Sequence, residues 1–327
     1  MIYNQVAGQD EIKKSLIKSI NNKLISHCYI FEGPKGMGKY ELALIFAQSL
    51  LCENFIIDPC NKCSSCIKFN SDNHPDLHVV NNQETTIKRE EIDELIDSVY
   101  KKPYESNKKV YIIKDAHEMT TQASNTFLKT LEEPPGDSIM ILLTTNVNLM
   151  LPTIVSRCQT IKFRNVSREV IKSYLVENYN IKDDLADLAA EYSKGILNKA
   201  VNIINDSDNI LKFREEIIKL FDKIIHTDSE IIYDLESYFE ENKVNIDLII
   251  EIMMIWIRDI MFMQNNMENL VLNKDCKQLL IEHGQLMKNN NDLIEIMQNT
   301  SNNIKSNVNY KLAIDNMLLK IQEVFKW

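Results

Sequence analysis

Three of the seven glycines in this 327-residue chain fall within six residues, between an apolar run and a helical pattern. Gly33, Gly36 and Gly38 follow the β-rich run CYIF (28–31) and precede the helical run ELALIFAQSLL (41–51). Glycine gives a tight loop its backbone freedom. A glycine loop between a strand and a helix presents backbone N–H groups and a helix N-terminus to phosphate. The segment therefore predicts a phosphate-binding loop in an α/β domain.

Short β-rich runs alternate with helical patterns over the first half of the chain. The apolar residues Ile92, Leu95, Ile96 and Val99 have the spacing of an amphipathic helix, and a further helix is predicted at about 120–133. This alternation predicts a parallel sheet covered by helices. The predicted strands are CYIF (28–31), LHVV (77–80), VYII (110–113), IMILLTT (139–145) and TIKF (160–163).

The second half of the chain has a different composition. All seven prolines lie at or before Pro152, so the patterns beyond Phe163 can be helical throughout. The stretch 246–262 is strongly apolar, but three charged residues fall on one helical face of it: Asp247, Glu251 and Arg258. We expect a core helix there rather than a membrane span.

The overall charge and length limit the class of protein. The length suggests two or three domains, and the net charge of −10 argues against a protein that mainly coats nucleic acid. The basic runs near Lys13 and Lys101 are more typical of solvated helix faces than of a nucleic-acid site. The N-terminus MIYNQVAGQDEIKK carries no readable secretory signal, and no apolar stretch is long enough to span a membrane. We expect a cytoplasmic protein.

The phosphate loop departs from the full nucleotide-hydrolysing pattern. Lys39 is the lysine expected to reach the terminal phosphates, but Tyr40 follows it where a small hydroxyl would bind Mg²⁺. After the strand KVYII, Lys114 replaces the carboxylate that would hold the metal, and Asp115 is one methylene shorter than the expected Glu. These changes predict that ATP or ADP binds weakly, if at all, and is not hydrolysed.

Four of the seven cysteines are close together, with the spacing Cys52-x7-Cys60-x2-Cys63-x2-Cys66. Such clustering in a reducing compartment indicates a metal site rather than disulfides. Four thiolates close a tetrahedral Zn²⁺ shell, so the zinc would be structural. An iron–sulfur cluster is the main alternative, although no Cys-Pro follows the last cysteine. Buried thiols that bind no metal are a weaker alternative.

The remaining candidate ligands are expected to have other roles. His74 begins the HPDL segment and His78 directly follows it, within the predicted strand 77–80; both are predicted not to bind the metal. His117 lies near the altered carboxylate positions, Lys114 and Asp115, where a histidine could suggest a catalytic base. Cys28, Cys158 and Cys276 are predicted to be small buried residues.

The order of these motifs resembles one family, the bacterial DNA polymerase III clamp-loader subunits of the AAA+ class. The resemblance extends to about residue 205 and rests on SHCYIFEGPKGMGK, the cysteine cluster, NHPDLHVV, YIIKDAHEMTTQASNTFLKTLEEPP, LLTTN and LPTIVSRCQTIKF. It implies zinc as the metal. It also implies an AAA+ domain (1–163) with a zinc-binding insertion, a helical lid (164–206) and an all-α collar (207–327).

Within the family, the altered metal positions and the HPDL segment resemble the delta′ branch rather than the tau/gamma motor branch. The resemblance implies a non-hydrolysing stator in a hetero-pentamer with tau/gamma and delta subunits, which loads the sliding clamp onto primer-template DNA. The alternative is an ATP-hydrolysing motor of the tau/gamma type or a related AAA+ helicase loader.

Four further positions take family roles by their place in the motifs. Thr145 and Asn146 match the sensor 1 segment, and the alternative is ordinary capping of a strand end. Asn198 stands where the sensor 2 segment normally has an arginine. Arg157 of the SRC motif matches an arginine finger that acts on the ATP of a neighbouring subunit, and guanidinium suits that role because it offers forked donors to phosphate oxygens.

Overall fold

The computed structural model describes residues 2–80, 86–226, 232–287, 290–306 and 308–326. The chain divides into two compact units that are interleaved along the sequence. The first contains Met1–Ile181 and Ser193–Val201, and the second contains Lys182–Tyr192 and Asn202–Trp327. These units are defined by which residues pack together, and they do not test the domain boundaries predicted at residues 163 and 206, which stay predictions.

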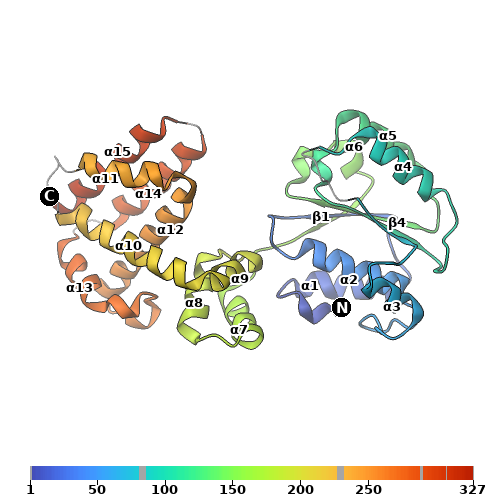
Figure 1. Ribbon diagram of the computed structural model, residues 1–327, viewed down its shortest axis with the longest axis horizontal. Helices are drawn as coiled ribbons and strands as arrows, with labels where there is room; N and C mark the ends of the chain where they lie inside the picture. Colours follow the sequence, from blue (N-terminus) through green and yellow to red (C-terminus); the bar gives the residue numbers. More distant parts are fainter. Residues whose placement is uncertain (1, 81–85, 227–231, 288–289, 307, 327) are drawn as a thin grey trace. The chain divides into compact units, whose positions relative to one another are not determined.

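The first unit is built on a parallel sheet of five strands, as the alternating pattern predicts (Figure 1). The strand order is β2-β3-β4-β1-β5, so β1 lies between β4 and β5, while β2 and β5 form the two edges. Because the strands are parallel, the segments that follow β1, β3 and β4 emerge at the same edge of the sheet. The strands are β1 (Cys28–Glu32), β2 (Leu77–Val80), β3 (Lys109–Ile113), β4 (Ser138–Thr144) and β5 (Gln159–Lys162).

Helices cover both faces of this sheet, as Figure 1 shows. Tyr29 and Phe31 of β1 belong to the core shared with Phe46 of α2, whereas Ile30 faces the opposite core with Phe127 of α5. This alternation is the period of two that a strand buried on both faces requires. The first face carries α1 (Asp10–Asn21) and α2 (Lys39–Leu51), with α3 (Ser64–Asn70) packed on α2, and the second carries α4 (Arg89–Val99), α5 (Thr121–Glu132) and α6 (Pro152–Val155).

Beyond the sheet, the first unit contains one whole helix and the first part of another, and between them residues 182–192 belong to the second unit. The helix α7 (Arg168–Tyr179) begins after Ser167, whose side chain accepts a hydrogen bond from the Val170 N–H. The helix α9 (Leu197–Asn205) begins in the first unit and ends in the second.

The second unit is helical throughout its described residues. The apolar stretch at 246–262 lies within α12 and places Trp256 in the core, so the predicted core helix is confirmed. Among the described residues no helix is long and apolar enough to cross a membrane. The helices are α8 (Asp183–Tyr192), α10 (Ser207–His226), α11 (Ile232–Glu241), α12 (Ile246–Gln264), α13 (Lys277–Leu286), α14 (Asn290–Lys305) and α15 (Tyr310–Lys326).

Charged side chains tie several of these helices together. Arg214 of α10 is buried and donates two hydrogen bonds to the carboxylate of Asp275, at 2.6 and 2.8 Å. Arg258 of α12 pairs with Glu191, which attaches α8 to α12 within the second unit. Such a pair needs both partners, because removing one leaves the other charge poorly solvated.

Candidate functional site

The phosphate loop connects β1 to α2 at the edge of the sheet where the parallel strands end. Gly36 and Gly38 have φ angles of 83° and 80°, in the left-handed region that glycine adopts without strain. Gly38 is the N-cap of α2, and Lys39 is the first residue of that helix. Gly33 directly follows β1, and its N–H donates to the carbonyl of Thr144. The predicted strand, loop and helix are therefore all present.

Lys39 is directed at its own loop. Only 9% of the residue is exposed, and its Nζ donates to the carbonyl oxygens of Gly33 and Pro34, the latter at 2.7 Å. Burial lowers the pKa of Lys39, while the carboxylate of Asp115 acts in the opposite direction. The ammonium that would bind terminal phosphates is thus engaged with the backbone that would surround them.

Tyr40 and Lys114, the residues at the two predicted metal-ligand positions, contact each other. The Nζ of Lys114 lies 3.6 Å from the centroid of the Tyr40 ring, which is a close cation–π contact. Burial raises the pKa of the Tyr40 hydroxyl. Asp115 lies 3.6 Å from the Nζ of Lys35 in the loop. An ammonium over an aromatic ring provides no oxygen ligand, and Mg²⁺ prefers oxygen ligands.

A cavity of about 190 Å³ lies over the loop. Asn198 approaches the loop backbone, where its N–H donates to the carbonyl of Gly36 at 3.1 Å. The structure therefore places the backbone of Asn198, the predicted sensor 2 position, next to the loop. A second cavity of about 160 Å³ shares Gly36, Gly38, Glu41 and Asn198 with the first. The first cavity is lined by Lys35, Gly36, Gly38, Lys39, Tyr40, Glu41, Lys114, Asp115, Leu143 and Asn198.

The two predicted sensor 1 residues follow β4, and both have local partners. The Asn146 side chain accepts a hydrogen bond from the N–H of Asn148 at 2.9 Å, so Asn146 caps the short 3-10 helix Val147–Leu149. The Thr145 hydroxyl lies 3.3 Å from Nε2 of His117. Among the described residues that line the 190 Å³ cavity, neither Thr145 nor Asn146 occurs. A role for Asn146 in nucleotide binding stays a prediction.

Arg157 follows the short helix α6 and precedes β5. Its side chain is 35% exposed, and its guanidinium donates to Oε1 of Glu132 at 2.8 Å and to the carbonyl of Thr153 at 2.9 Å. Sequence reasoning missed Glu132 as the partner, although the LKTLEEPP motif contains it. The arginine is therefore held at the surface by contacts that a stronger anionic partner can replace.

Cys28 and Cys158 correct a sequence-based prediction. They form a disulfide, with a Cα–Cα distance of 4.7 Å, rather than two separate thiols. The reason is strand order: β1 and β5 are parallel neighbours with Tyr29 opposite Gln159, so the residues one position earlier face each other. Cys158 and Cys276 are also only partly buried, in contrast to the prediction.

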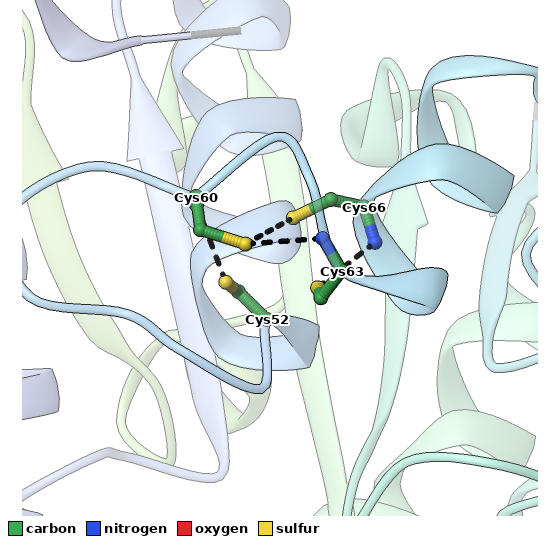
Figure 2. A group of neighbouring side chains, drawn as sticks. All are labelled: Cys52, Cys60, Cys63 and Cys66. Carbon is green, nitrogen blue, oxygen red and sulfur yellow. Dashed lines mark hydrogen bonds between the residues drawn. The ribbon is translucent and has the colours of Figure 1, made fainter.

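The four clustered cysteines converge on one point (Figure 2). Their sulfur atoms all lie within 4.8 Å of one another. Backbone N–H groups donate to three of the sulfurs at 3.3 to 3.4 Å: Cys60 to Cys52, Cys63 to Cys60, and Cys66 to Cys63. The N–H groups of Lys62 and Cys63 lower the pKa of the Cys60 thiol to about 6, whereas burial raises that of Cys66.

The HPDL segment has a structural role that sequence reasoning missed. Nε2 of His74 lies 2.9 Å from the hydroxyl of Ser65 on α3, so this histidine has a partner outside the cysteine cluster. Asp76 is fully buried and accepts hydrogen bonds from the N–H groups of residues 104–106, at 2.6 to 2.9 Å. Burial acts to raise the pKa of Asp76, but these donors outweigh it and hold the pKa below its usual value. His78 stacks on Tyr111 of β3.

A second group of possible metal ligands lies in the second unit. Asp222, His226 and His283 bring one ligand atom each to within 4.8 Å of the others. The Trp256 indole N–H donates to Nδ1 of His283 at 3.0 Å, so Nε2 carries the proton and faces Asp222 at 3.1 Å. Burial keeps this histidine neutral by lowering its pKa. With both ring nitrogens used in this way, His283 offers no lone pair to a metal.

Three comparisons with known proteins bear on this site. The sequence profile of the family described as "DNA polymerase III, delta subunit" matches residues 8–167. The chain is 30% identical to DNA polymerase III subunit delta′ of Bacillus subtilis, over 96% of both chains. It is 33% identical to subunit gamma/tau of Mycoplasma pneumoniae, but that match covers 62% of this chain and 30% of the relative. Among solved structures, a gamma subunit-related protein from Thermotoga maritima aligns over 95% of this chain and 99% of that chain, with 17% identity and a TM-score of 0.47.

Proposed function

The chain belongs to the delta′ subunits of the bacterial DNA polymerase III clamp-loader family, and on that premise we propose that it is a stator that hydrolyses no ATP itself. The observation that carries this proposal is the contact between Lys114 and Tyr40, at 3.6 Å. A catalytic site for phosphoryl transfer needs Mg²⁺ and an oriented water. Here an ammonium and a phenol ring fill the positions of the metal ligands, and the loop lysine binds its own backbone.

The proposal includes a role for Arg157 in trans. Its guanidinium is at the surface, and its pair with Glu132 is half exposed, so it contributes little stability and is readily exchanged. A γ-phosphate of a neighbouring ATPase subunit offers more charge than one carboxylate, and forked donors suit it. We infer that the chain supplies this arginine to a tau/gamma subunit, in a cytoplasmic complex with delta that places the sliding clamp on primer-template DNA.

We also propose a structural Zn²⁺ at Cys52, Cys60, Cys63 and Cys66. Four thiolates suit its tetrahedral shell and leave no position for a reactive water. The N–H groups that donate to three of these sulfurs stabilise the thiolate form that a metal requires. When bound, the ion supplies folding energy rather than chemistry. Metal analysis of protein purified under reducing conditions should give one zinc per chain, whereas iron would indicate a cluster instead.

Two measurements test the stator role. The isolated chain should turn over no ATP, and Lys39→Ala should change nothing in that assay. In the reconstituted loader, Arg157→Ala should slow ATP hydrolysis stimulated by clamp and DNA while the complex still assembles. An arginine finger contributes about 10³ to 10⁵ in rate at one site, but the effect on the whole complex is smaller because other sites have their own fingers.

The identity to gamma/tau relatives favours one second candidate, an ATP-hydrolysing motor subunit. The same experiment separates the two. Turnover by the isolated chain that Lys39→Ala abolishes would support the motor. Unchanged hydrolysis and clamp loading with Arg157→Ala in a fully assembled complex would leave the chain a purely structural subunit.

A further inference from the structure

The disulfide between Cys28 and Cys158 joins the loop of Arg157 to the sheet. Cys28 is the first residue of β1, and Cys158 lies between Arg157 and the first residue of β5. We propose that these two cysteines are a reversible oxidation site, at which a small disulfide such as oxidised glutathione fastens the arginine loop to β1. Their Cα–Cα distance of 4.7 Å is within the range that a disulfide bridges without backbone movement.

Access to the two sulfurs is unequal, and this sets the order of the exchange. Cys28 is fully buried, whereas Cys158 is partly exposed. In oxidation, the Cys158 thiolate attacks one sulfur of the small disulfide and releases one small thiolate. The thiolate of Cys28 then attacks the Cys158 sulfur of the mixed disulfide and releases the second. The two protein thiols lose two protons and two electrons, and the small disulfide becomes two thiols. Reduction reverses these steps.

The mechanical effect follows from the weak attachment of β5. This strand has four residues and lies at the edge of the sheet, and in the described part of the chain it pairs with β1 alone. Before it, single backbone hydrogen bonds join residues 156–158 to the turn of α6: Ser156 to Pro152, Arg157 to Ile154 and Cys158 to Val155, at 2.9 to 3.3 Å. In the described part of the chain, the disulfide is the one covalent cross-link between β1 and the segment that leads into β5. In the reduced protein, the start of β5 and the loop should therefore open more often.

The location makes this opening relevant to Arg157, which is the residue next to Cys158. A fastened loop keeps the guanidinium in one position, whereas an opening loop must be ordered again each time it engages a phosphate. We infer that the oxidised chain presents its arginine more effectively than the reduced chain. This last step rests on the proposed finger role, while the oxidation itself does not.

The first experiment tests the chemistry on the full chain with its metal in place. The protein is equilibrated with mixtures of reduced and oxidised glutathione, quenched with an alkylating agent and mapped by mass spectrometry. A peptide that links Cys28 to Cys158 should form and disappear reversibly. Cys28→Ala and Cys158→Ser should abolish it, and Cys276→Ala in the second unit serves as the matched control. Failure to form the link at any ratio, or a link that reduced glutathione never opens, would overturn the proposal.

The second experiment tests the effect on the loop. Amide hydrogen exchange at residues 156–160 should be about tenfold faster in the reduced chain and in Cys28→Ala than in the oxidised chain. The reconstituted loader should hydrolyse ATP faster with the oxidised chain, and Cys28→Ala should remove this dependence. Equal exchange in both states would refute the fastening of the loop. If Arg157→Ala leaves ATP hydrolysis unchanged, the proposed function fails, while mass mapping and exchange still decide the oxidation site.

Discussion

The cysteine cluster and the phosphate loop are the two predicted ligand sites of the first unit, but they differ in where their polar groups point. In the cluster, four sulfurs face a common centre, and backbone N–H groups support them without filling it. In the loop, Lys39 binds loop carbonyls, Lys114 covers the Tyr40 ring and Asp115 pairs with Lys35. The four sulfurs of the cluster face one another, whereas the charged groups of the loop are paired within the protein.

This difference shows that the backbone geometry of a site and the contacts of its side chains can vary independently. The loop keeps its glycines, its left-handed φ angles and its helix N-terminus, all of which are backbone features of a phosphate site. The side chains of Tyr40, Lys114 and Asp115 depart from the metal-binding pattern, and each contacts another residue of the protein: Tyr40 and Lys114 contact each other, and Asp115 contacts Lys35. The backbone geometry of a phosphate loop is thus present where the side chains beside it are engaged with one another.

The largest expected effect is on the cluster. Cys66→Ser removes a buried thiolate from the shell, so the chain should lose its zinc, and the apparent free energy of unfolding of the first unit should fall by several kcal/mol. Metal analysis and denaturant unfolding measure the two effects. Cys276→Ser, in the second unit, should retain both zinc and stability. A zinc-free Cys66→Ser chain as stable as the parent protein would show that the metal does not support the fold.

The pH dependence of zinc binding tests the cysteine cluster in a second way. In the metal-free protein the pKa of Cys60 is lowered to about 6, so above that pH zinc displaces no proton from Cys60, although it still displaces one from Cys66, whose pKa is raised by burial. Below about pH 6 zinc must displace one more proton, and the apparent affinity should fall by about a further factor of ten for each pH unit. Competition with a chromophoric chelator between pH 5 and 8 measures this. A slope that stays constant through pH 6 would contradict it.

The loop should respond to restored metal ligands. Tyr40→Thr combined with Lys114→Asp removes the cation–π pair and returns a hydroxyl and a carboxylate to the positions that hold Mg²⁺. The double variant should bind ADP about tenfold more tightly with Mg²⁺ than the parent chain does, since a single added ligand contact is of that order. Calorimetry with and without Mg²⁺ tests it, and Lys102→Asp is the control for charge alone. Equal ADP affinity in the parent chain and the double variant would mean that features other than Tyr40 and Lys114 limit nucleotide binding.

The smallest expected effect concerns the ring of Tyr40. Tyr40→Phe keeps the aromatic face under Lys114 and should leave stability unchanged, whereas Tyr40→Leu should lower the apparent free energy of unfolding by about 0.5 to 1 kcal/mol. Thermal unfolding of the two variants in parallel makes the comparison. If both variants behave alike, the contact at 3.6 Å contributes nothing measurable.

The features that the sequence predicts well are local ones. Every predicted strand occurs within about one residue of its place, because buried parallel strands are continuous apolar runs between turns. The cysteine cluster follows from spacing within fifteen residues. The features it missed join distant segments. The disulfide spans a separation of 130 residues and depends on β5 lying next to β1, and the three N–H groups around Asp76 come from residues about thirty positions later.

The interleaving of the two units also determines how the gene can be divided. The chain crosses between units after residues 181, 192 and 201, and the last crossing lies inside α9. A fragment that ends at residue 201 contains Glu191 of α8 but lacks Arg258, its ion-pair partner. A fragment that starts at residue 202 contains Arg258 but lacks Glu191. No single stop codon or protease cut therefore yields two complete halves, and expressing either unit alone requires residues 182–192 to be moved from one coding segment to the other.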